Sequence, residues 1–164
     1  MVLKKIILVR HAKSSWKFNV IDHQRPLKTR GYNDAEIISK SLKGEAIIVD
    51  KLVSSDAVRA KTTAEIFINN LNIDESIIEF NNDLYDFSGE KLIKVIKNID
   101  DTTNNLMIFG HNHAITAFVN TFGTKYIDNV PTSGVVIIEF DIVNWSDLKQ
   151  GITVKTLFPR DFKP

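Results

Sequence analysis

The sequence contains no cysteine among its 164 residues. Disulfide bonds, thiolate metal ligands and a thiol nucleophile are therefore all excluded. Charge of one sign is lacking too, because 21 lysines and arginines face 20 aspartates and glutamates, a formal net charge of +1. Proteins that bind nucleic acids or anionic membranes usually carry a strong local or global excess of positive charge. The overall charge predicts neither as a partner.

Long apolar runs are also missing, since no stretch approaches the roughly 20 residues that span a bilayer. The opening residues, MVLKKIILVRHAK, place only four apolar residues after a basic pair, which is too few for the centre of a signal peptide. We therefore expect a cytoplasmic protein. The length suits a single domain over residues 1–164.

The chain does contain a regular alternation of apolar runs and helical patterns. Strands are predicted at residues 5–9, 50–54, 76–80, 105–109, 134–140 and 152–158, and helices at about 30–43 (with Thr29 as its cap), 57–70, 89–98 and after 111. Alternation of this kind is typical of a three-layer α/β/α fold around a mainly parallel, six-stranded sheet. No helix separates the last two strands, so one of them is expected to be antiparallel.

Basic side chains follow three of these strands. Arg10 and His11 end the first strand, His111 follows the fourth, and Arg59 lies in the first turn of the helix after the second. In open α/β sheets, ligands bind outside the carboxyl ends of the strands. We therefore expect these four side chains to meet in one pocket.

Such a pocket favours an anion, because the guanidinium fork of arginine matches phosphate oxygens in a bidentate manner. A neutral imidazole beside guanidinium charges can serve as a nucleophile, since those charges disfavour its protonation. The pattern predicts that Arg10 holds a phosphate and that His11 attacks it. The pair His111 and His113 is poor metal-ligand geometry and has no carboxylate cluster beside it.

Seven segments together resemble one known family. They are LVRHAKSSW (8–16), RPLKTRGYNDA (25–35), LVSSDAVRAKTTAEI (52–66), LYDFSGEKL (84–92), IFGHNHAI (108–115), VPTSGVVIIEFD (130–141) and FPRDF (158–162). In order, they resemble the histidine phosphatase superfamily, whose Arg-His-Gly signature has Ala12 here in place of glycine. The alanine form is common in the SixA-type phosphohistidine phosphatases.

The resemblance implies a phosphoglycerate mutase-like fold and a two-step reaction without metal or other cofactor. His11 is implied as the nucleophile that forms a phosphohistidine, and Arg10, Arg59 and His111 as the groups that bind the phosphoryl oxygens. The implied substrate is phosphohistidine on a protein partner, a histidine phosphotransfer domain in signal transduction.

Two other functions stay open at this point: a phosphatase for small phosphate esters, and a phosphate-binding module without turnover. Asp86 is the candidate general acid, although a phosphoramidate nitrogen can already be protonated at neutral pH and then needs none. Lys13 and Lys17 could receive a larger acidic substrate. Trp145 is interpreted as an anchor of a surface loop.

Overall fold

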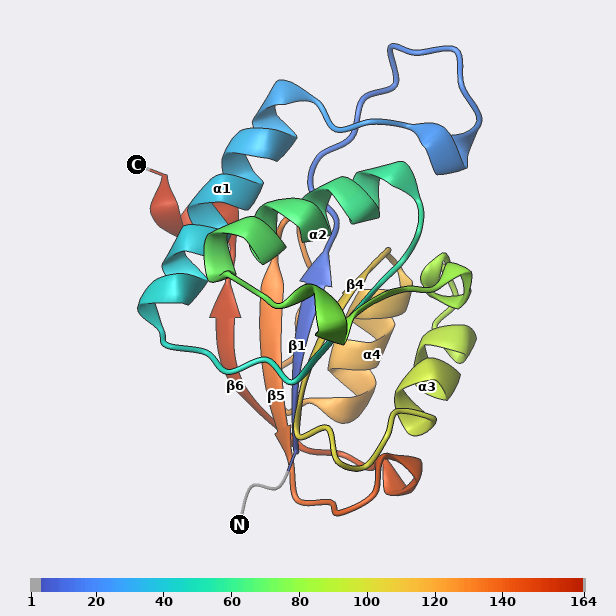
Figure 1. The fold of residues 1–164 in the computed structure, drawn as a ribbon, viewed down its shortest axis with the longest axis vertical. Helices are drawn as coiled ribbons and strands as arrows, with labels where there is room; N and C mark the ends of the chain where they lie inside the picture. The colour runs from blue at the N-terminus through green and yellow to red at the C-terminus, as the bar shows by residue number, and fades with distance from the viewer. Residues whose placement is uncertain (1–3, 164) are drawn as a thin grey trace.

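Ten regular elements carry the fold of the computed structural model, which describes residues 4–163 (Figure 1). They are β1 (Lys4–Arg10), α1 (Thr29–Gly44), β2 (Lys51–Ser54), α2 (Val58–Leu71), β3 (Ile78–Phe80), α3 (Glu90–Lys97), β4 (Asn105–Gly110), α4 (Ala114–Phe122), β5 (Val135–Phe140) and β6 (Ile152–Leu157). Short 3₁₀ turns join them: η1 (Asp22–Gln24), η2 (Glu75–Ile77), η3 (Asn82–Leu84), η4 (Trp145–Asp147) and η5 (Pro159–Phe162). Each predicted strand and helix is present, with its ends shifted by a few residues at most.

The six strands form one sheet in the order β3-β2-β4-β1-β5-β6. The pairs β3–β2, β2–β4 and β4–β1 are parallel, whereas β5 runs antiparallel to both β1 and β6. The sheet is therefore mixed, with β5 as the reversed strand. This confirms that one of the last two strands is antiparallel.

Helices cover both faces of the sheet, α1 and α2 on one side and α3 and α4 on the other (Figure 1). Because successive strand side chains point to opposite faces, β1 contributes to two cores. Ile7 and Val9 pack in the α1/α2 core, and Ile6 and Leu8 pack in the α3/α4 core. A strand buried on both faces explains the unbroken apolar run, and the three-layer arrangement is confirmed.

Trp145 anchors the β5–β6 connection, as predicted, and it does so from within the core. Its side chain is fully buried in the α3/α4 core, and its indole Nε1 donates a hydrogen bond to the Thr103 carbonyl at 2.9 Å. The Asp101 carboxylate accepts from the Trp145 amide at 2.7 Å. The β5–β6 connection therefore folds back over the end of α3, a contact that local sequence does not reveal.

Thr29, by contrast with its prediction, is not the cap of α1. The cap position falls on Lys28, whose carbonyl accepts from the Gly31 and Tyr32 amides, and Thr29 is the first helical residue. Between residues 4 and 163, no helix is both long and apolar enough to cross a bilayer.

Candidate active site

His11 and His111 lie next to each other at the carboxyl ends of two adjacent strands. β1 and β4 pair in parallel with Arg10 opposite Gly110, so the residue after each strand emerges at the same edge. The His11 amide donates to the Gly110 carbonyl at 3.1 Å. The two ring centroids are 5.2 Å apart with planes inclined by 51°. The structure thus brings together the two histidines that the strand pattern predicted.

The imidazole of His11 is buried and oriented by its neighbour. Its Nδ1 lies 2.7 Å from the Ala12 carbonyl, so we assign the proton to Nδ1, which leaves a lone pair on Nε2. Burial is the largest influence on this ring and lowers its pKa to about 3, against the opposing hydrogen bond to Ala12. The charges of Arg59, Arg10 and Arg25 contribute to this lowering. His11 is therefore neutral at physiological pH.

His111 is held from its other side by a serine that the sequence reasoning missed. Its Nε2 lies 2.8 Å from Oγ of Ser55, the residue that follows β2. Ser55 Oγ accepts from the Ala57 amide, so its own proton is available to Nε2, and we assign the His111 proton to Nδ1. Burial, then the neighbouring His11 and Arg59, lower the pKa of His111 to about 2. The sequence signal that could have identified Ser55 is the position of its hydroxyl side chain directly after a strand.

The two arginines enter the same space from β1 and α2. Arg10 Nη1 donates to the Val130 carbonyl at 2.8 Å, and the Arg59 side chain is 2% exposed. Both guanidinium groups lower the pKa of His11, so they lie within electrostatic reach of its ring. All four predicted residues, Arg10, His11, Arg59 and His111, therefore converge.

Three buried nitrogens of this cluster have no hydrogen-bond partner: Arg10 Nε, Arg59 Nε and His111 Nδ1. A buried donor without an acceptor costs about 1–3 kcal/mol, and such groups are rare. Three unpartnered donors in the same cluster as the free Nε2 of His11 form a site that suits an oxyanion. The hydroxyl of Ser133 is buried and unpartnered as well, and the Ser133 amide donates to the carbonyls of Arg10 and His11 at 3.1 Å each.

A second group of residues, beyond those predicted, closes the site on the loop side. Asp22 on η1 bonds Arg59, and its other oxygen accepts from Arg25 Nε at 3.0 Å. Tyr85 lies over His111 with ring centroids 5.3 Å apart. Arg25 is 8% exposed, with its guanidinium 3.5 Å over the Trp16 ring. No signal in the irregular segment before Pro26 marked Asp22.

The structure places Asp86, the candidate general acid, at the start of helix α3. Its two carboxylate oxygens accept five hydrogen bonds, from the hydroxyl and amide of Ser88 and from the amides of Gly89, Lys91 and Leu92. These amides open helix α3, whose first turn leaves N–H groups free. The Asp86 carboxylate therefore holds the start of α3 from the loop before it, where Gly89 is the N-cap residue, and both its oxygens are engaged there.

Other chemistry is sparse in the described part of the chain. Residues 4–163 hold no group of three or more histidines and carboxylates placed to bind a metal ion. His113 is exposed at the start of α4.

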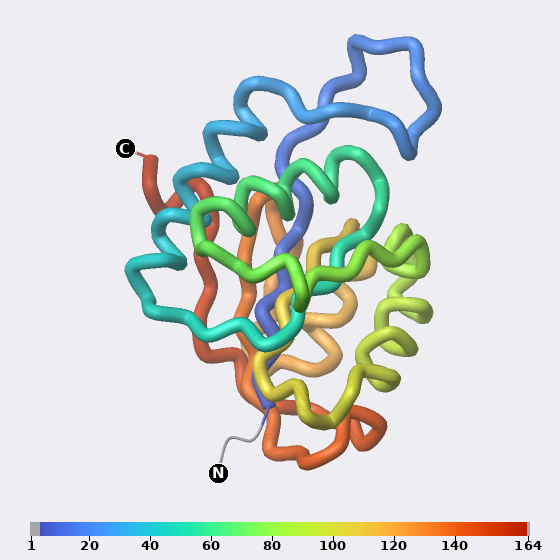
Figure 2. The backbone as a smooth tube through the Cα atoms, viewed as in Figure 1, coloured from blue at the N-terminus to red at the C-terminus, as the bar shows by residue number. Residues whose placement is uncertain are grey.

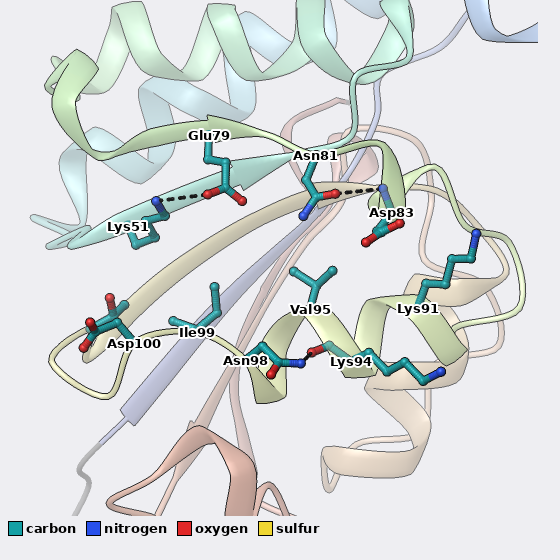
Figure 3. A pocket seen from close by; sticks show the side chains of 11 residues that line it. Lys51, Glu79, Asn81, Asp83, Lys91, Lys94, Val95, Asn98, Ile99 and Asp100 are labelled. Carbon is teal, nitrogen blue, oxygen red and sulfur yellow. Dashed lines mark hydrogen bonds and ion pairs between the residues drawn. The ribbon is translucent and has the colours of Figure 1, made fainter.

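A cavity of about 610 Å³ lies between the β2–β3 edge and α3 (Figure 3). Lys51 and Glu79 form an ion pair of 3.5 Å at its wall, and Val95 and Ile99 from the α3 side contribute apolar surface. It contains none of the four predicted residues, and its charges are mixed in sign. The chemistry of the predicted site lies elsewhere, at the ends of β1 and β4.

Comparisons with known proteins agree with this geometry. The family model of the histidine phosphatase superfamily (branch 1) matches residues 6–88. The fold is similar to that of a candidate phosphohistidine phosphatase SixA from Agrobacterium tumefaciens, at a TM-score of 0.80 and 23% identity over 94% of this chain and 97% of the other. It is similar to the protein histidine phosphatase SixA complexed with tungstate (TM-score 0.79, 19% identity, 97% and 99% covered). A phosphoglycerate mutase from Bacillus anthracis also shares it (0.65, 17%, 94% and 92%), which confirms the predicted fold class.

Proposed function

The chain belongs to the histidine phosphatase superfamily, and from that premise we propose that it is a metal-independent phosphatase acting on phosphohistidine in a protein. The observation that carries the proposal is the free Nε2 of neutral His11 beside three buried donors that lack acceptors. A nucleophile and a set of anion-binding groups in one place are what phosphoryl transfer requires.

In the first step, His11 Nε2 attacks phosphorus, forming a nitrogen–phosphorus bond while the bond to the leaving group breaks. Nδ1 keeps its proton, so the phosphorylated ring becomes cationic, and the Ala12 carbonyl at 2.7 Å stabilises that charge. In the second step, water attacks phosphorus, and inorganic phosphate leaves as Nε2 regains its lone pair. Dividing the displacement in two lowers each barrier.

The phosphoryl oxygens take the unpartnered nitrogens of Arg10, Arg59 and His111. Charge spreads over these oxygens in the transition state, and preorganised donors in a water-poor site are worth a few kcal/mol each. Because the donors are fixed by Val130 and Ser55 before substrate arrives, little reorganisation is needed during the reaction.

The carboxylates near the site support a phosphoramidate substrate. Asp86 is occupied by the start of α3, and Asp22 is occupied by two arginines and a tyrosine. An ester oxygen leaves as an alkoxide and needs a proton donor, whereas a protonated imidazole leaves as a neutral group. A site whose nearby acids are engaged in this way suits the second kind of leaving group.

A groove beside the site supports a substrate of protein size. Its volume is about 720 Å³, and it is lined by Lys13, Ser14, Ser15, Trp16, Lys17, Phe18, Leu27, Lys28, Thr29, Arg30 and Tyr32. None of these residues is acidic, and Trp16 is 76% exposed. Cations among exposed aromatic rings fit an acidic protein surface better than a small ester. The SixA protein of similar fold, a protein histidine phosphatase, supports the same substrate class. Signalling and a cytoplasmic location stay predictions.

The deciding experiment offers the protein a phosphorylated histidine phosphotransfer domain and, in parallel, a panel of phosphate esters, all with a chelator present. We expect the phosphoprotein to be preferred and the His11→Asn variant to be inactive on every substrate. Preference for one ester would replace the proposal by a small-molecule phosphatase. Phosphate binding without hydrolysis would identify the protein as a phosphate-binding module. Loss of activity in the presence of the chelator would contradict the metal-independent mechanism.

A further inference from the structure

Asp22, on η1, binds Arg59 through both its carboxylate and its backbone carbonyl. The segment between β1 and α1 leaves the sheet and returns, and it places η1 beside the start of α2 (Figures 1 and 2). There, Arg59 Nη2 donates to Asp22 Oδ2 at 2.9 Å, and Nη1 donates to the Asp22 backbone carbonyl at 2.8 Å. Both terminal nitrogens of one arginine therefore end on a single residue of the loop.

This arrangement determines which part of Arg59 remains for a ligand. A guanidinium group is planar and rigid, so fixing its two terminal nitrogens also fixes the direction of Nε–H. Arg59 Nε is buried and is one of the three donors without a partner. We propose that Asp22 is a positioning residue, which holds Arg59 so that its Nε–H is directed at the phosphoryl group. The proposal rests on the function proposed for the same site.

Further bonds hold Asp22 itself. Arg25 Nε donates to Oδ1 at 3.0 Å, and the Tyr85 hydroxyl donates to Oδ2 at 2.5 Å. Burial alone would raise the pKa of Asp22, but hydrogen bonds from Tyr85, Arg59 and Arg25 outweigh it and keep that pKa well below its usual range. The carboxylate is thus charged wherever His11 is neutral.

The negative charge has a second effect on the cluster. Arg10 and Arg59 repel each other, as the lowered pKa of Arg10 shows, for which burial is the first cause and Arg59 the second. The Asp22 carboxylate bonded to Arg59 offsets that repulsion and lets two guanidinium groups share one anion. Asparagine at position 22 would keep an oxygen for Arg59 and lose the charge.

A carboxylate on an arginine can also imitate phosphate and block the site, which is the competing interpretation. The contacts argue against it. Asp22 bonds Arg59, Arg25 and Tyr85, but it makes no hydrogen bond to His11, His111 or Arg10. The three unpartnered nitrogens are therefore not occupied by it.

The test compares Asp22→Asn with Asp83→Asn, a control that removes the same charge from an exposed residue lining the cavity of Figure 3. Two quantities are measured: kcat and KM for an aryl phosphate, and the affinity for inorganic phosphate by calorimetry. For Asp22→Asn we expect about tenfold weaker phosphate binding, a similar rise in KM, and a lower kcat. Tyr85→Phe, which leaves both arginine contacts, should show a smaller effect, and the control should match wild type.

Tighter phosphate binding by Asp22→Asn would show that the carboxylate blocks the site, and unchanged binding in a folded variant would show that it has no role; either overturns the proposal. Calorimetry needs no turnover, so this outcome is separable from failure of the proposed function, which is judged by the wild-type and His11→Asn activities.

Discussion

The imidazole rings of His11 and His111 stand 5.2 Å apart, centroid to centroid, at the ends of two parallel strands. The pairing of Arg10 with Gly110 forces both rings to one edge of the sheet. Burial and proximity act together there, because each buried ring would resist the charge of the other. Two neutral histidines among arginines are the result.

The His11→Asn substitution should abolish turnover. It removes the nucleophilic nitrogen while keeping a planar polar group, and we expect kcat to fall by about 10⁴-fold or more. Hydrolysis of an aryl phosphate, with chelator present, measures the effect. His113→Asn is the matched control, because His113 is exposed at the start of α4 and should retain wild-type activity. Unchanged hydrolysis by His11→Asn would exclude the covalent mechanism.

Replacing Arg59 by lysine should separate charge from geometry. Lysine keeps one positive charge but lacks the planar fork that meets Asp22 and the ligand together. We expect kcat/KM to fall by about 10²- to 10³-fold, the usual effect of losing one oriented donor. Arg160→Lys, at an exposed position on η5, provides the comparison. Equal activities of the two variants would contradict the assignment of Arg59.

Stability should decline on mild acidification because of the two buried histidines. Their folded-state pKa values of about 3 and about 2 lie below the unfolded value near 6.5, so the unfolded chain binds more protons as pH falls. Each ring should therefore cost about 1.4 kcal/mol per pH unit below about pH 6, and the loss is complete only below the folded pKa values. Urea unfolding from pH 7 to 4.5 measures the slope.

His11→Asn provides the control for this pH dependence. It should lessen the slope by the share of one histidine, since asparagine does not titrate. A slope identical to that of wild type would mean that His11 does not resist protonation in the folded protein.

Removing the Asp86 carboxylate should cost stability and spare the chemistry. Asp86→Ala leaves the first amides of α3 without their acceptor, at a cost of about 1–2 kcal/mol. Thermal unfolding measures that loss, and activity is compared on aryl and alkyl phosphates. A fall of about 100-fold confined to alkyl phosphates, which have the poorer leaving group, would instead identify Asp86 as the acid.

Gly31 tests the close packing of helix α1 against the backbone segment that follows His11. A Cβ at this position would lie 2.2 Å from the carbonyl oxygen of Lys13, two residues after His11. Gly31→Ala should therefore displace that strand-end segment, costing about 1–3 kcal/mol and lowering kcat/KM. Gly44→Ala is the control within the same helix, because nothing lies within 4 Å of its Cβ. If both substitutions are equally neutral, the close approach to Lys13 has no consequence.

Sequence reasoning succeeded where the informative residues adjoin apolar runs. Arg10 ends β1, and His11 and His111 directly follow β1 and β4; parallel strands place such residues at one edge regardless of the loops between them. It was less successful where function depends on a contact between distant irregular segments. Asp22 reaches Arg59 across 37 positions, and no periodic pattern records that approach.

The chain by itself determined the layers, the order of its elements and the position of the proposed nucleophile, because apolar periodicity and strand ends are local properties. Tertiary structure alone decided which groups restrain the proposed catalytic side chains. The burial of Trp145 and the hold of Asp22 on Arg59 each depend on where a loop returns. That return is set by the packing of the whole domain, which no short stretch of sequence encodes.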